Sequence, residues 1–210
     1  MGMEVHTDIS RLLEMLTASG NHYDIEKINN AYAYAAKMHE GQFRASGEPY
    51  ISHPIAVAEI VAGLGLDTDS ICAALLHDTV EDAGTHPEEI RHAFGEEVLR
   101  LVLFDTEDKT QSWEERKRRT LHALKNCDRP CAMLVCADKL ANIRDIVSGL
   151  AQYGESIWSR FHFSREKQKW LYQEYVAVLE RISDLKMYDE LKTAVDTVFM
   201  KEDSNHANCD

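Results

Sequence analysis

Apolar residues recur every three to four positions along most of the chain, with polar residues between them. This spacing places the apolar side chains on one face of a helix. Runs of alternating β-branched and aromatic residues, which are typical of strands, are nearly absent. The pattern predicts an all-α fold, a helical bundle of about ten helices. The expected helices are Asp8–Thr17, Tyr23–His39, Ile55–Leu64, Ser70–Asp82, Pro87–Ala93, Glu96–Phe104, Trp113–Asn126, Cys131–Ser148, Arg165–Ser183 and Met187–Met200.

The segment between the second and third expected helices, residues 40–54, breaks this pattern. It contains Gly41, Gly47, Pro49 and Pro54, which favour turns and interrupt helices. Binding residues are often found on a shaped loop between two helices. We therefore expect part of a functional site there. Because composition does not change sharply along the chain, we expect one domain over residues 1–200 and a polar C-terminal tail over 201–210.

The net charge of −13 disfavours binding to nucleic acids or anionic membranes, since a polyanion is repelled by the average field. A phosphorylated ligand would have to be small and bound by local positive charge. No run approaches the roughly 18 apolar residues of a membrane span, and the first residues carry no signal-peptide pattern. We expect a cytoplasmic protein with a small-molecule partner, and the oligomeric state stays open.

The clearest chemical signal lies where the apolar helical run Ala73–Leu76 ends in His77, Asp78, Glu81 and Asp82. Polar and ionisable groups at the end of a core helix are costly unless they bind something. Residues four apart share one face of a continuous helix, which pairs His77 with Glu81 and Asp78 with Asp82. His77 and Asp78 can then reach one metal ion, and Glu81 lies one turn further on for a water molecule or a substrate.

A second helix repeats this arrangement: Asp138 follows the apolar run Met133–Cys136, and Asn142 comes one turn later. An aspartate buried there requires a cation or a partner. His53, at the exit of the loop, is the third candidate, although such a histidine taken alone is more often an ordinary loop residue. Two imidazoles with two carboxylates suit Mn²⁺, Fe²⁺ or Zn²⁺.

The order of these residues resembles the HD-domain phosphohydrolase superfamily, in which two histidines and two aspartates hold a catalytic metal. The surrounding segments HEGQFRASGEPYISHPIAVAEI, AALLHDTVEDAGTHPEEIRHAFGEEV, DKT and VCADKLANIRDI are similar to the hydrolase domain of RelA/SpoT-type enzymes, especially the stand-alone small alarmone hydrolases, or metazoan SpoT homologues. Four separated motifs arrive in the family's order. The resemblance covers most of the chain, residues 30–180.

This resemblance implies Mn²⁺-dependent hydrolysis of the 3′-pyrophosphate of guanosine tetra- or pentaphosphate, giving GDP or GTP plus pyrophosphate. It implies that Glu81 and Asp82 position and activate the water, and that Asn142 lies near the attacked phosphate. The implied metal ligands are His53, His77, Asp78 and Asp138. The residues expected to meet the nucleotide are Arg44, Ser46, Lys109, Lys139, Arg144 and Tyr172. Long members of the family continue with a synthetase domain, for which no residues remain here, so we expect degradation without synthesis.

Two further hypotheses stay open. Ala45 and Trp113 stand where relatives often carry basic residues, and this change favours a phosphatase acting on another nucleotide, such as NADPH or a deoxynucleotide. The chain is alternatively a metal-binding module that senses a nucleotide without hydrolysing it. The acidic pair Glu81 and Asp82 weighs against that last interpretation, because a non-catalytic module has little need of it.

Overall fold

The computed structural model describes residues 7–161 and 163–199 and confirms the all-α prediction. The α-helices are α1 (Ser10–Ser19), α2 (Ile25–Met38), α3 (Ser52–Gly63), α4 (Thr68–Leu76), α5 (Thr79–Asp82), α6 (Pro87–Phe94), α7 (Glu96–Asp105), α8 (Trp113–Leu124), α9 (Arg129–Tyr153), α10 (Arg165–Leu179) and α11 (Lys186–Phe199). Two 3₁₀-helices, η1 (Gly154–Arg160) and η2 (Glu180–Ile182), follow α9 and α10. The loop before α3 holds an isolated β-bridge between Phe43 and Pro49.

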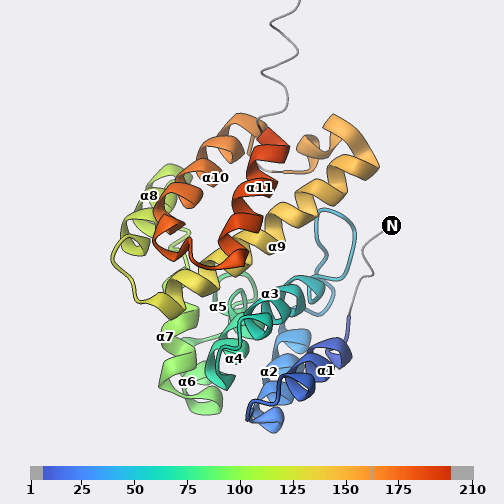
Figure 1. Ribbon diagram of the computed structural model, residues 1–210, viewed down its shortest axis with the longest axis vertical. Coiled ribbons are helices and arrows are strands. Elements are labelled where there is room, and N and C mark those ends of the chain that lie inside the picture. The colour runs from blue at the N-terminus through green and yellow to red at the C-terminus, as the bar shows by residue number, and fades with distance from the viewer. Residues whose placement is uncertain (1–6, 162, 200–210) are drawn as a thin grey trace, which may run out of the picture.

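Helix α9 runs through the middle of the bundle, with α1–α7 on one side and α8, α10 and α11 on the other (Figure 1). It packs against α3, α4 and α7 on the first side and against α10 and α11 on the second. Every residue from Cys131 to Asp138 is buried, as expected for a helix enclosed on all sides. The middle of α9 is therefore one place where a side chain is shielded from water.

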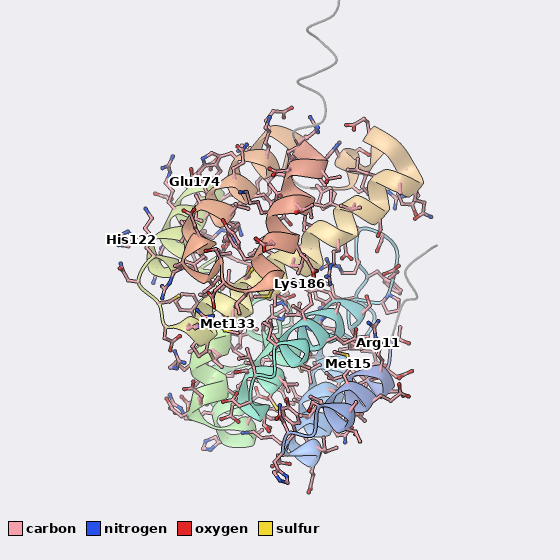
Figure 2. All side chains as sticks on the ribbon, in the orientation of Figure 1. Arg11, Met15, His122, Met133, Glu174 and Lys186 are labelled. Atoms are coloured by element: carbon pink, nitrogen blue, oxygen red, sulfur yellow. The ribbon has the colours of Figure 1, made fainter. Side chains whose placement is uncertain are left out.

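Helix α4 is enclosed in the same way, because its residues from Ser70 to Leu76 are all buried against α2, α3 and α7. Polar and charged side chains cover the outside of the bundle, for example Arg11, His122, Glu174 and Lys186 (Figure 2). Among the described helices, none is both long and apolar enough to span a membrane.

The expected continuous helix Ser70–Asp82 is wrong, because α4 ends at Leu76 and the short helix α5 begins at Thr79. The Thr79 hydroxyl donates to the carbonyl of Leu76 at 2.7 Å, and His77 Nδ1 lies 2.9 Å from the carbonyl of Ala74. Such side-chain bonds to nearby carbonyls compete with the regular helical pattern. The chain therefore turns at His77 and Asp78.

Helix α9 is longer than the expected Cys131–Ser148. Asp128 accepts a hydrogen bond from the Cys131 backbone N–H, and Pro130 lies in the first turn, a position that lacks an intrahelical partner. The helix continues to Tyr153, after which Gly154 adopts φ +58°. The expected end of the last helix at Met200 and the tail 201–210 lie outside the described residues, and the single-domain assignment stays a prediction.

Candidate active site

Three segments far apart in the sequence bring His53, His77 and Asp138 together: the start of α3, the turn after α4 and the middle of α9. Ligand atoms of these three residues all lie within 4.8 Å of one another. Asp138 Oδ1 lies 3.0 Å from His53 Nε2 and 3.6 Å from His77 Nε2. All three side chains are buried. This spacing leaves one common point that a single ion can reach.

Asp78 joins the same group from the turn between α4 and α5. Its Oδ2 lies 3.3 Å from His77 Nε2 and 3.7 Å from His53 Nε2. The four expected ligands thus converge, and we call them the metal centre.

The hydrogen bonding of His77 tests whether a cation fits this centre. Its Nδ1 donates to the Ala74 carbonyl, so Nε2 is the nitrogen that faces the carboxylates and is left for a proton or a cation. This Nε2 is buried and has no hydrogen-bond partner among the described residues. A metal-ligating histidine typically uses its second nitrogen in this way, to fix the tautomer. The residues present therefore fit a divalent ion.

The electrostatics of the metal centre also favour binding of a divalent ion. Burial lowers the pKa of His53 and favours the neutral imidazole, which is the form that binds metals. Burial also lowers the pKa of His77, but the carboxylates of Asp78 and Asp138 outweigh it and raise that pKa well above its usual value. The carboxylates of Asp78 and Asp138 thus attract positive charge to the point that the imidazoles face.

The acidic pair Glu81 and Asp82 lies on α5, beside the metal centre. Glu81 Oε2 accepts a hydrogen bond of 2.9 Å from the Glu107 backbone N–H, and burial raises the pKa of its carboxyl. Lys109 forms an ion pair with Asp82 Oδ1 and lies 3.8 Å from Glu81 Oε1. Lys109 therefore contacts the acidic pair directly.

Tyr50 was missed by the sequence analysis. Its hydroxyl donates to Asp78 Oδ2 at 2.8 Å, with Asp82 Oδ2 at 3.2 Å as a second acceptor. Burial and the two carboxylates raise the pKa of the phenol, which keeps its proton available as a donor. The signal was available in the sequence, since Tyr50 lies three residues before His53 in the loop singled out as functional.

A second hydrogen-bond network starts from Asn142, one turn after Asp138 on α9. The Asn142 amide donates to Asp138 Oδ1 at 2.6 Å and accepts from Arg44 at 2.8 Å. Arg44 also pairs with Asp145 at 2.5 Å. Positions 138, 142 and 145 share one face of α9, so this helix connects the loop arginine to the metal centre.

Two cavities adjoin at this network. The smaller, of about 180 Å³, is lined by Arg44, Tyr50, His53, Asp78, Glu81, Asp82, Glu107, Lys117, Asp138, Lys139 and Asn142. The larger, of about 350 Å³, is lined by Arg44, Ala45, Ser46, Trp113, Arg116, Lys117, Lys139, Asn142, Asp145, Ile146, Gly149, Ile157, Phe161, Phe163, Gln168, Leu171, Tyr172 and Tyr175. Four residues line both cavities: Arg44, Lys117, Lys139 and Asn142. A ligand that fills both would cross a boundary with three cations.

The larger cavity is charged near this boundary and aromatic elsewhere. Tyr172 and Ser46, both expected to meet a nucleotide, line it, and the buried Ser46 hydroxyl has no hydrogen-bond partner among the described residues. Lys139 Nζ lies 5.1 Å from the ring centre of Tyr175 and 2.5 Å from Asp138 Oδ2. Lys139 thus spans the distance between the metal centre and the aromatic wall.

Glu107 pairs with one cation of this boundary and with a second cation of the larger cavity, and it was also missed. Its carboxylate is only 6% exposed and pairs with Arg116 at 2.9 Å and Lys117 at 2.8 Å. One carboxylate facing two cations leaves a net positive charge beside the cavities. Nothing in the spacing of residues along the chain pointed to this pairing.

Arg144 does not reach the site. Its guanidinium donates to Glu190 of α11 at 2.6 Å, and the residue lines neither cavity. On a helix, residues two apart point about 200° away from each other. Arg144 therefore faces away from the side of α9 that carries Asn142, and its expected contact with the nucleotide is not supported.

Comparisons with known proteins identify the family of this chain. The HD domain family matches residues 31–166. A GTP pyrophosphokinase of Myxococcus xanthus is 34% identical over 82% of this chain, and a guanosine-3′,5′-bis(diphosphate) 3′-pyrophosphohydrolase of Xenopus tropicalis is 42% identical over 59% of it. The alignments span 22% of the length of the Myxococcus protein and 71% of the Xenopus one.

Two solved structures share the fold. The protein lmo0812 of Listeria monocytogenes is 36% identical, with a TM-score of 0.67, and the match covers 70% of this chain and 99% of that one. A metazoan ortholog of SpoT, described as hydrolysing ppGpp, is 27% identical, with a TM-score of 0.69, and the match covers 86% of this chain and 98% of that one. This chain belongs to the HD-domain family, and its relatives there include the metazoan SpoT ortholog.

Proposed function

We propose that this chain is a Mn²⁺-dependent hydrolase that removes the 3′-pyrophosphate of guanosine tetra- or pentaphosphate, giving GDP or GTP plus pyrophosphate. The observation that carries the proposal is the pair of adjoining cavities, one at the metal centre and one lined by aromatic rings, with three shared cations. A nucleotide with a diphosphate on its 3′ oxygen has parts that suit both. The Xenopus relative, a guanosine-3′,5′-bis(diphosphate) 3′-pyrophosphohydrolase, and the metazoan ortholog that hydrolyses ppGpp support the same substrate.

The ligands of the ion would be His53, His77, Asp78 and Asp138. A divalent ion bound there polarises a phosphate oxygen and lowers the pKa of a water molecule. Mn²⁺ suits this nitrogen and oxygen donor set, and Fe²⁺ and Zn²⁺ suit it as well. The identity of the metal is therefore part of the proposal.

The chain's own residues divide the remaining work. Hydrolysis adds the hydroxyl of water to the phosphorus bound to O3′, takes up a proton from that water and returns one to the leaving ribose oxygen. Glu81 and Asp82 would accept the first proton, and the raised pKa of the Glu81 carboxyl supports Glu81 as the base. Asn142 lies beside the metal centre on the side of Arg44, where it would orient the attacked phosphate.

Positive charge at the boundary would hold the phosphates. Arg44 offers a planar fork of N–H donors, which matches phosphate oxygens, and Lys139 and Lys117 add point charges. The aromatic part of the larger cavity would take the nucleoside, with Tyr172 and Ser46 on its wall. A small nucleotide rather than a nucleic acid agrees with the net charge of −13, and we propose that it is met in the cytoplasm.

A hydrolysis panel tests the proposal. The purified chain, loaded with Mn²⁺, is offered guanosine tetraphosphate, NADPH and deoxynucleoside triphosphates, and the products are separated by anion-exchange chromatography. We expect GDP and pyrophosphate in equal amounts from guanosine tetraphosphate. If the main product were orthophosphate released from NADPH or a deoxynucleotide, that nucleotide would be the substrate instead of guanosine tetraphosphate.

That second substrate class has one observation in its favour. Ala45 and Trp113, which carry no charge where relatives often have basic residues, both line the larger cavity. Fewer cations there would suit a ligand with fewer phosphates. Binding of guanosine tetraphosphate without any turnover in Mn²⁺ would instead support a sensing module.

A further inference from the structure

Tyr50 connects the two functional parts of the smaller cavity. Its hydroxyl donates to Asp78 Oδ2, and the same Oδ2 faces His77 Nε2 at 3.3 Å and His53 Nε2 at 3.7 Å. The second acceptor of this hydroxyl is Oδ2 of Asp82, at 3.2 Å. One neutral donor thus touches a metal ligand and a member of the acidic pair.

The position of this hydroxyl is set by packing. The Tyr50 ring stacks on the buried His39 ring at 4.6 Å, with an angle of 21° between the planes. The Arg44 guanidinium lies 5.5 Å from the ring centre, and the Tyr50 backbone N–H donates to the Gln42 carbonyl at 3.0 Å. Stacking, a cation and a backbone hydrogen bond therefore leave the phenol little freedom to turn away from the carboxylates.

We propose that Tyr50 is a positioning residue that fixes the orientation of Asp78 for the metal and of Asp82 for the attacking water. The role of Tyr50 at Asp82 rests on the proposed function, whereas its role at Asp78 requires only that the metal centre binds a divalent ion.

Both roles of Tyr50 have a physical basis. Asp78 and Asp82 are like charges that repel each other, and a carboxylate without a fixed donor can rotate about its terminal bond. Tyr50 holds Oδ2 of Asp82 while Lys109 pairs with its Oδ1, so both oxygens of that carboxylate are occupied. A hydrogen bond from outside the ligand set also orients a metal ligand, and loss of such partners typically weakens metal binding or activity 10- to 100-fold.

Tyr50→Phe tests this directly, because it removes the hydroxyl and keeps the ring that contacts His39 and Arg44. Mn²⁺ affinity of the metal-free protein is measured by isothermal titration calorimetry, and kcat and KM are measured with guanosine tetraphosphate at saturating Mn²⁺. We expect the Kd for Mn²⁺ to rise roughly 10-fold or more and kcat to fall by about the same factor. KM should stay unchanged, since Arg44 and the larger cavity are intact.

Tyr188→Phe is the matched control. Tyr188 is buried, whereas Tyr50 is half-buried, and the Tyr188 hydroxyl likewise donates to an oxygen, the Val176 carbonyl at 3.2 Å, but this residue lines neither cavity. Both metal-free variants should melt at temperatures within a few degrees of each other, while only Tyr50→Phe binds Mn²⁺ more weakly.

Three results would overturn the proposal. The first is unchanged Mn²⁺ affinity and kcat in Tyr50→Phe, and the second is a higher KM alone, which would make Tyr50 a substrate contact. The third is a loss of metal binding accompanied by a much lower melting temperature than in Tyr188→Phe, which would make its role one of general stability. If the wild-type chain does not hydrolyse guanosine tetraphosphate, the calorimetric Kd for Mn²⁺ still tests whether Tyr50 positions Asp78.

Discussion

Asp78 and Glu81 lie three residues apart, yet their surroundings assign them different tasks. Asp78 faces both imidazoles, whereas Glu81 is held by the Glu107 backbone and lies near Lys109. We therefore expect Asp78→Ala to lose metal and activity together. Glu81→Gln should keep the metal while turnover falls, by roughly 10²- to 10⁴-fold for a general base. Both variants are assayed for kcat and, after gel filtration, for metal content by mass spectrometry. A metal-loaded Asp78→Ala variant would refute the ligand assignment.

Arg44 and Arg144 offer a matched pair of arginines for testing the phosphate boundary. Arg44 lines both cavities, whereas Arg144 pairs with Glu190 away from them. A hydrogen bond to a charged group contributes about 1.5–3 kcal/mol, so Arg44→Ala should raise KM for guanosine tetraphosphate roughly 10- to 100-fold. Arg144→Ala should leave KM unchanged and lower stability by at most about 1 kcal/mol, because its ion pair is partly exposed. Equal effects on KM would contradict the placement of Arg44.

The site residues that the sequence alone could indicate are those whose polar side chains are unfavourable to bury without a ligand. His77, Asp78 and Asp138 follow apolar runs and met this condition, whereas His53 was identified through the family resemblance. The structure brings the four side chains together. Tyr50 and Glu107 were missed because their partners come from other segments and depend on how the loops fold. Arg144 was assigned from its place in a motif, without regard to the face of the helix on which it lies.

The start of α8 is a capping box that sets the position of Trp113, Arg116 and Lys117. The Ser112 hydroxyl accepts from the Glu115 backbone N–H, and the Glu115 carboxylate accepts from Ser112 in return. Loss of an N-cap costs typically about 1 kcal/mol. We expect Ser112→Ala to lower the free energy of unfolding by that amount in a urea titration. Ser112→Thr keeps a hydroxyl that can both accept and donate, so it should lie close to wild type, and equal losses in both variants would argue against a capping role.

Helical periodicity predicted most elements but not the break between α4 and α5. A period of apolar residues reports only which face of a helix is buried, and it continues through Leu76 without a sign of the turn. The break arises from hydrogen bonds of His77 and Thr79 to carbonyls of the preceding turn. The same turn aims His77 and Asp78 at the metal centre, so the local irregularity and the site have one cause.

The metal centre joins parts of the bundle that are distant in sequence, because its ligands come from α3, the α4–α5 turn and α9. Helix α9 is also the element that separates the two sides of the bundle (Figure 1). An ion bound there would link the whole N-terminal side to the central helix. Without it, the carboxylates of Asp78 and Asp138 and the buried Nε2 of His77 face one another with fewer compensating contacts.

Removal of the metal should therefore lower the stability of the entire bundle. A ligand that binds only the folded state stabilises it by about 2.7 kcal/mol at 100 times its Kd, and for a chain of this size each kcal/mol shifts the melting temperature by about 2–4 °C. We expect EDTA to lower the melting temperature of the Mn²⁺-loaded protein by roughly 5–10 °C in differential scanning calorimetry. Asp138→Asn, which lacks one ligand, should show little or no shift. If neither Mn²⁺ nor EDTA changes the melting temperature of the wild-type protein, these side chains do not hold an ion.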